Sequence, residues 1–92
     1  SLQMQLAKPV ILLVDDDPAM LRLLAKWLET EGYVVRRAGN GQEAIESIQA
    51  ECPDILVTDW EMPLVDGMEL CRWVRRVNLP HYLYTIFLTV RS

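Results

Sequence analysis

The stretch from Ile55 to Gly67 reads I-L-V-T-D-W-E-M-P-L-V-D-G. It begins with the apolar run Ile55-Leu56-Val57, which is typical of a strand buried on both faces of a parallel sheet. The run leads to Asp59, a carboxylate at the carboxyl end of the predicted strand. Ligands of open parallel sheets bind in the crevice at that end, so Asp59 is a candidate functional residue.

The second half of the same stretch predicts a loop followed by a helix. Pro63 interrupts regular strand pairing, and Asp66-Gly67 is a turn and cap pair that can open a helix. An alternative is that Asp59 only caps this helix. Asp66 is closer to the helix and better suited to that role, which leaves Asp59 available for chemistry.

The composition of the 92 residues is that of one small globular domain. Hydrophobic residues make up 51% and charged residues 24%, unlike a disordered chain. The net charge of −4 argues against direct nucleic-acid binding by this segment. The longest apolar run, 10–14, is too short to cross a bilayer, and no signal-peptide pattern precedes it. We expect a soluble cytoplasmic module without a membrane partner.

The cysteines and the histidine do not form a metal-binding pattern. Cys52 and Cys71 lack metal-ligand spacing, and His81 is the single histidine. We therefore expect two reduced thiols that are packed or partly packed in the domain.

A second apolar run, Val10 to Val14, ends on three consecutive carboxylates, Asp15, Asp16 and Asp17. Pro18 sets the φ of a first helical position, and Asp17 before it is a good N-cap. Asp17 therefore has a structural role in this interpretation. Asp15 and Asp16 do not, and both are candidates for a site.

The first helix is predicted from about Pro18 to Glu31, and Gly32 is its expected left-handed stop. Its apolar face is expected to place Trp27 and the leucines in the core. The predicted face consists of Met20, Leu24, Trp27 and Leu28, widened by Leu21 and Leu23.

Short strands and helices alternate along the rest of the chain. Asn40 with Glu43 three positions later is a cap pattern that opens a second helix, and Pro53 ends it. The further predicted elements are a strand at 33–35 at the edge of the sheet, the strand that begins at Ile55, a helix at 68–77 and a strand at 84–88. Residues 1–8 carry no pattern and are expected to be a tail or remnant, with the domain at 9–92.

This alternation predicts an α/β fold with a parallel sheet and right-handed crossovers. In the flavodoxin-like order 2-1-3-4, strands one and three are neighbours where the order reverses. That order would bring Asp15, Asp16 and Asp59 into one crevice. Thr89 would lie beside them at the end of strand four.

Clustered carboxylates repel one another, which raises the pKa of at least one of them unless a cation binds. Mg²⁺ prefers oxygen ligands, and the absence of soft or imidazole ligands in the predicted crevice argues against zinc or copper. With Mg²⁺ bound, a carboxylate can accept a phosphoryl group, as in aspartyl-phosphate formation. The hydroxyl of Thr89 is positioned to donate to a phosphoryl oxygen.

Together these motifs resemble the response-regulator receiver domain of bacterial two-component signalling. The residues that carry the resemblance are V-D-D-D-P at 14–18, N-G-Q-E-A at 40–44, D-W-E-M-P-L-V-D-G at 59–67 and F-L-T at 87–89. The resemblance covers about residues 10–89. It implies a flavodoxin-like receiver fold truncated after the fourth strand, with the fifth strand and last helices missing.

The resemblance also implies roles for individual residues. Asp59 would be the phosphoacceptor and a metal ligand, Asp16 would bind Mg²⁺ directly, and Asp15 would bind it directly or through water. Glu61 would supply its backbone carbonyl to the metal, and Thr89 would be the switch hydroxyl. The implied partners are a sensor histidine kinase and an output domain or effector protein beyond residue 92. The domain would catalyse only its own phosphorylation and dephosphorylation.

Two alternatives stay open, one from a departure from the family pattern and one from a different interpretation of the first acidic motif. Receivers carry an essential Lys on the fifth strand, whereas Lys8 and Lys26 both precede Asp59. A pseudo-receiver, an interaction module that is never phosphorylated, is one alternative. The other is a haloacid-dehalogenase-like phosphatase, whose first strand ends in Asp-x-Asp, as Asp15 and Asp17 do here. That enzyme class would give no role to Asp59.

Overall fold

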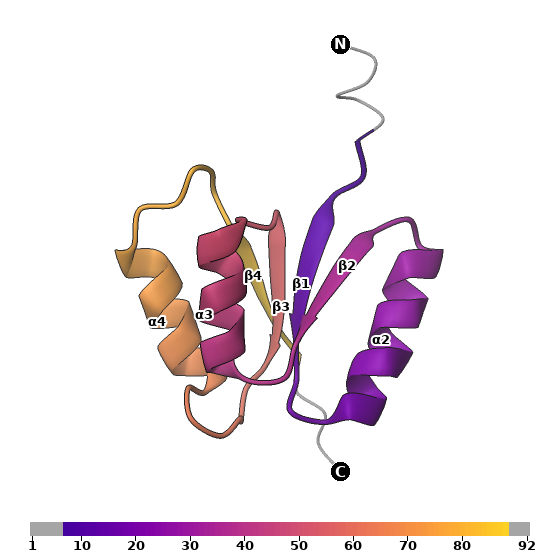
Figure 1. Cartoon of the computed structure of the whole chain (residues 1–92), viewed down its shortest axis with the longest axis horizontal. Helices are drawn as coiled ribbons and strands as arrows, with labels where there is room; N and C mark the ends of the chain where they lie inside the picture. The colour runs from indigo at the N-terminus through magenta and orange to yellow at the C-terminus, as the bar shows by residue number, and fades with distance from the viewer. Residues whose placement is uncertain (1–6, 89–92) are drawn as a thin grey trace.

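Four parallel strands form the centre of the molecule, in the order β2-β1-β3-β4. This computed structural model describes residues 7–88. Figure 1 shows α2 on one face of the sheet and α3 and α4 on the other. The strands are β1 (Val10–Val14), β2 (Val34–Ala38), β3 (Ile55–Asp59) and β4 (Tyr84–Leu88), and the helices are α2 (Pro18–Thr30), α3 (Gly41–Ala50) and α4 (Gly67–Arg76). The predicted strand order 2-1-3-4 is confirmed.

The two central strands are buried on both faces, as their unbroken apolar runs predict. Alternate side chains of a strand point to opposite faces. Leu12 and Leu56 pack with residues of α3 and α4, whereas Leu13 and Val57 pack with residues of α2. Full burial of one such side chain stabilises the fold by roughly 1.5–3 kcal/mol. This double burial holds β1 and β3 side by side.

Aspartate caps begin the helices that follow the two central strands. The side chain of Asp17 accepts a hydrogen bond from the backbone N–H of Ala19 at 3.0 Å. Asp66 likewise accepts from the N–H of Glu69 at 2.9 Å. Gly32, one residue beyond the cap of α2, has a φ of 101°, the predicted left-handed conformation. These local signals therefore set where both helices begin and where α2 ends.

The prediction that Trp27 lies in the core is wrong. Its side chain is 60% exposed, and that of Leu23 is 65% exposed. Leu21 and Ala25 are the buried residues of α2 instead. At about 100° per residue, Trp27 lies about 200° around the helix from Ala25. Trp27 therefore lies on the side of α2 opposite the residues that pack on the sheet.

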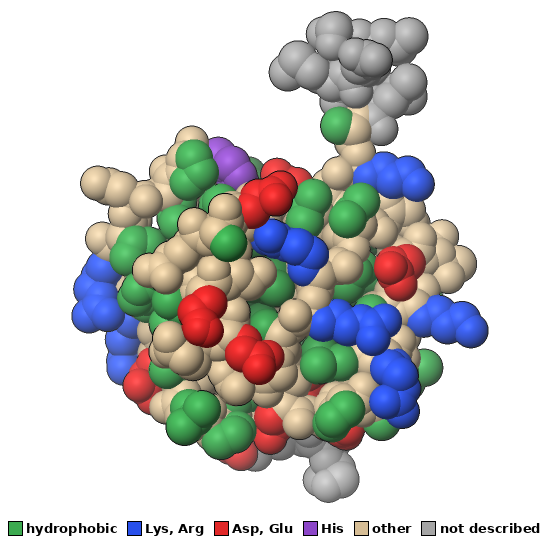
Figure 2. Space-filling model, in the orientation of Figure 1, with side chains coloured by type: hydrophobic (Ala, Val, Ile, Leu, Met, Phe, Trp, Pro, Cys, Tyr) green, Lys and Arg blue, Asp and Glu red, His purple; other side chains and the backbone are tan. Residues whose placement is uncertain are grey.

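Charged side chains of both signs cover the face of the molecule seen in Figure 2, with hydrophobic side chains between them. Cys52 and Cys71 are free and partly buried, as predicted. Within residues 7–88, no helix is both long enough and apolar enough to span a lipid bilayer.

Candidate functional site

Three carboxylates meet where β1 and β3 end. The register pairs Val14 with Thr58, so the residues that follow them, Asp15 and Asp59, lie at the same level at the carboxyl end of the two strands. Asp15, Asp16 and Asp59 each offer a carboxylate oxygen, and these oxygens lie within 4.8 Å of one another. The predicted convergence of the three acids is therefore found in the structure.

Backbone N–H groups hold two of these side chains in place. Asp15 Oδ1 accepts a hydrogen bond from the N–H of Asp17 at 2.9 Å, and the N–H of Asp15 donates to the Ala38 carbonyl at 3.2 Å. Asp59 Oδ1 accepts from the N–H of Trp60 at 2.7 Å. Asp15 and Asp59 are half-buried and fixed by the chain that follows each strand. Asp16 is exposed.

The electrostatic environment disfavours the ionised form of Asp15. Burial raises the pKa of Asp15 above its usual 3.8, and the hydrogen bond from the N–H of Asp17 opposes this shift. The charges of Asp59, Asp16 and Asp17 raise the pKa further. A cation in the cluster would offset both the desolvation and the repulsion.

The acids line a hollow of about 270 Å³ at this end of the sheet. Its lining residues are Asp15, Asp16, Asp17, Met20, Leu24, Asp59 and Leu88. The polar side chains among them offer only carboxylate oxygens, the donor type that Mg²⁺ prefers. The donor set of the described residues therefore fits a hard divalent cation.

Two predicted site residues stand apart from this description. Glu61 is exposed, two residues beyond Asp59, and its role as a carbonyl ligand stays a prediction. Thr89 lies outside the described residues, and its role as the switch hydroxyl also stays a prediction.

A close contact beside Asp59 was not foreseen from the sequence. A Cβ atom added at Gly67 would collide with the carbonyl oxygen of Asp59 and would lie 3.2 Å from Phe87 Cε1. The N–H of Gly67 donates to the Trp60 carbonyl at 3.0 Å. The rings of Trp60 and Phe87 meet edge to face, with centroids 4.7 Å apart. The sequence marked Gly67 only as part of a turn, because the contact is between segments that tertiary packing brings together.

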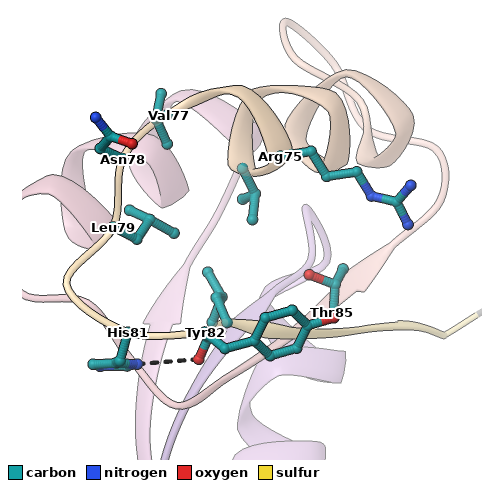
Figure 3. A pocket seen from close by; sticks show the side chains of 9 residues that line it. Arg75, Val77, Asn78, Leu79, His81, Tyr82 and Thr85 are labelled. Carbon is teal, nitrogen blue, oxygen red and sulfur yellow. Dashed lines mark hydrogen bonds between the residues drawn. The ribbon is translucent and has the colours of Figure 1, made fainter.

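A larger hollow lies elsewhere, between the end of α4 and the start of β4 (Figure 3). Its volume is about 650 Å³. Arg75 and His81 are the basic residues that line it. Nδ1 of His81 lies 3.1 Å from the Tyr82 carbonyl oxygen. No carboxylate is among its described lining residues. This hollow therefore lacks the carboxylate ligands that the acidic cluster offers to a cation.

Comparison with known proteins adds independent evidence on the family. The family model described as "Response regulator receiver domain" matches residues 11–92. The transcriptional regulatory protein TrcR of Mycobacterium tuberculosis is 46% identical over 82 residues, which are 89% of this chain and 31% of TrcR. The alkaline phosphatase synthesis transcriptional regulatory protein PhoP of Bacillus subtilis is 41% identical over 69 residues, which are 75% of this chain and 29% of PhoP. The chain thus spans about a third of the length of these relatives.

Solved structures agree with the sequence comparison. A response regulator receiver domain protein from Clostridium thermocellum has a TM-score of 0.81 at 30% identity, over 88% of this chain and 64% of that one. The family match spans most of the chain, and the fold and the clustered acids are those that the motifs predict. This chain belongs to the response regulator receiver domain family.

Proposed function

We propose that this receiver domain accepts a phosphoryl group on Asp59 from a histidine kinase, with Mg²⁺ held by Asp15, Asp16 and Asp59. The observation that carries the proposal is the convergence of three carboxylate oxygens within 4.8 Å. Membership of the receiver family supports the direction of transfer, from a kinase to an aspartate. The oxygen-only donor set supports Mg²⁺ as the cation.

The geometry around Asp59 supports its role as the nucleophile. The N–H of Trp60 holds Asp59 Oδ1 at 2.7 Å, which orients the carboxylate and leaves Oδ2 for the bond to phosphorus. In the transfer, the Asp59 oxygen–phosphorus bond forms while the bond from phosphorus to the kinase histidine nitrogen breaks. Mg²⁺, when bound, would neutralise the negative charge on the phosphoryl oxygens. We assign the Glu61 carbonyl as a further metal ligand and Thr89 as the hydroxyl that donates to the phosphoryl group.

Phosphorylation then shifts the receiver between two conformations, and an output domain responds to this shift. TrcR and PhoP are named as transcriptional regulatory proteins, and this chain matches about a third of each. We propose that residues 9–92 form the receiver part of such a regulator. The output domain or effector would lie beyond residue 92, and the domain would act from the cytoplasm.

Phosphorylation of the full chain tests the proposal directly. The chain is incubated with Mg²⁺ and acetyl phosphate, or with a phosphorylated histidine kinase, and the bound phosphate is counted by intact mass spectrometry. We expect at most one phosphate per chain and none in Asp59→Asn. Asp66→Asn is the matched control, because it makes the same change seven residues later and an asparagine still caps α4.

Three other results would contradict the proposal. Full labelling of Asp59→Asn would show that Asp59 is not the phosphoacceptor. Mg²⁺ binding without any label on Asp59 would favour the pseudo-receiver. Continuous release of inorganic phosphate from a general phosphomonoester would favour the phosphatase class.

A further inference from the structure

One wall of the acidic hollow is apolar. Met20 and Leu24 from α2 and Leu88 from β4 line the hollow together with the carboxylates. Leu88 is the register partner of Asp59 across β3 and β4. Met20 and Leu24 are four residues apart and therefore lie on the same side of α2. Leu88 thus stands beside the proposed phosphoacceptor, and Met20 and Leu24 face the same hollow.

Core packing does not account for the side chain of Met20. Leu21, its neighbour, is buried in the core cluster beneath α2, and Leu24 packs against that cluster. Met20 is half-buried and belongs to neither core cluster of the described residues. Within residues 7–88, the long apolar side chain of Met20 therefore faces the hollow without packing in either core cluster.

We propose that Met20 restricts the access of water to a phosphoryl group on Asp59 and so lengthens the life of the phosphorylated state. The inference rests on the proposed role of Asp59. During hydrolysis the oxygen of water bonds to phosphorus, and the bond between phosphorus and the Asp59 oxygen breaks. The Asp59 carboxylate is released, the attacking water gives its proton to solvent, and inorganic phosphate leaves.

The physical reason is that Met20 both fills space and lacks a strong hydrogen-bonding group. A thioether accepts hydrogen bonds only weakly, so it neither orders nor activates a water molecule beside the phosphoryl group. Its flexible, unbranched chain adapts to an irregular wall. Met20 touches neither proton nor leaving group in this scheme, and it acts as a positioning residue that excludes solvent.

The test measures the lifetime of the phosphorylated full chain. Each variant is phosphorylated with acetyl phosphate and Mg²⁺, the donor is removed on a desalting column, and the remaining phosphorylated fraction is followed by mass spectrometry. Met20→Gln keeps the length of the side chain and adds a polar amide, whereas Met20→Ala opens space. We expect both to speed the first-order loss of phosphate roughly three- to tenfold once the donor has been removed.

Two further variants separate water exclusion from a general loss of structure. Met20→Leu keeps an apolar wall and should retain the lifetime of the unmodified chain. Leu23→Gln makes a similar polar change on an exposed residue of the same helix that is not among the lining residues, and it should also leave the lifetime unchanged.

The outcomes distinguish this inference from the proposed function. If Asp59 is labelled and Met20→Gln loses phosphate at the rate of the unmodified chain, the role of Met20 is refuted and the phosphoacceptor role stands. An equal acceleration in Leu23→Gln would also refute it, because the effect would belong to the helix. Failure of every chain to take up label would overturn both proposals together.

Discussion

At the scale of single residues, Asp15 is the acid whose ionisation the fold opposes. Burial raises its pKa above 3.8, and three neighbouring aspartates raise it further. The folded chain therefore binds more protons than the unfolded chain as pH rises from about 3.8 through the folded pKa of Asp15. Over that interval the free energy of unfolding falls with rising pH. At neutral pH the ionised Asp15 remains a destabilising group when no cation is bound.

Asp15→Asn is predicted to stabilise the metal-free chain at neutral pH. The amide oxygen can still accept the hydrogen bond from the N–H of Asp17, while the charge is removed. Since Asp15 is only partly buried, we expect a gain of up to about 1 kcal/mol in the free energy of unfolding. The gain should disappear below pH 3.8, where the aspartic acid is also neutral. Urea unfolding in the presence of a chelator, followed by circular dichroism, measures both values.

A matched variant controls for the change in net charge. Glu46→Gln removes one negative charge from an exposed position of α3. It should alter stability less than Asp15→Asn and without the same pH dependence. An Asp15→Asn chain that is no more stable than the unmodified chain at neutral pH would contradict the electrostatic account of the cluster.

At the scale of elements, the end of β3 and the start of α4 meet at Gly67. The absence of a Cβ atom there lets α4 approach the carbonyl of Asp59 and the ring of Phe87. Gly67→Ala is predicted to lower the free energy of unfolding by about 1–3 kcal/mol, because backbone atoms would have to move to make room. The fluorescence of Trp60 should change in the same variant, since Trp60 lies against Phe87. Urea unfolding and emission spectra measure the two effects.

Gly39→Ala is the matched control for this contact. Its added Cβ atom would meet Glu43 Oε1 at 3.3 Å, the movable end of a side chain. We expect a much smaller loss of stability in Gly39→Ala than in Gly67→Ala. Equal losses would mean that the glycine change itself, and not the approach of α4 to β3, decides the result.

At the scale of the whole molecule, the acidic cluster joins two βα units that are far apart in sequence. Asp15 and Asp16 follow β1, and Asp59 ends β3. A cation that binds all three should therefore stabilise the complete fold. At a Mg²⁺ concentration ten times the dissociation constant, binding adds about 1.4 kcal/mol. For a domain of this size, that gain raises the melting temperature by roughly 5–10 °C.

Differential scanning fluorimetry with and without Mg²⁺ measures this stabilisation. Asp16→Asn and Asp59→Asn should each reduce the shift strongly, because each removes the charge of one of the proposed ligands. The same ionic strength supplied as sodium chloride controls for screening of surface charges. A sodium chloride series that reproduces the Mg²⁺ shift would contradict a specific cation site.

Much of the fold was predictable because its signals are local. The apolar runs of β1 and β3, the caps Asp17 and Asp66 and the left-handed Gly32 depend on residues close in sequence. The alternation of these elements then predicted the strand order and the convergence of the acids. Trp27 was misplaced because the apolar residues of α2 span a wide part of the helix, and periodicity alone does not show that the side with Leu21 and Ala25 is the one that packs on the sheet.

The sequence by itself determined the elements of this protein, their caps and the acids that follow β1 and β3. Those features depend on steric and hydrogen-bonding preferences within a few residues. Only the tertiary structure decided the exposure of Trp27, the close approach of α4 at Gly67 and the place of Met20 at the acidic hollow. Each of these features depends on contacts between segments that are far apart in sequence. The packing of the helices on the sheet sets those contacts.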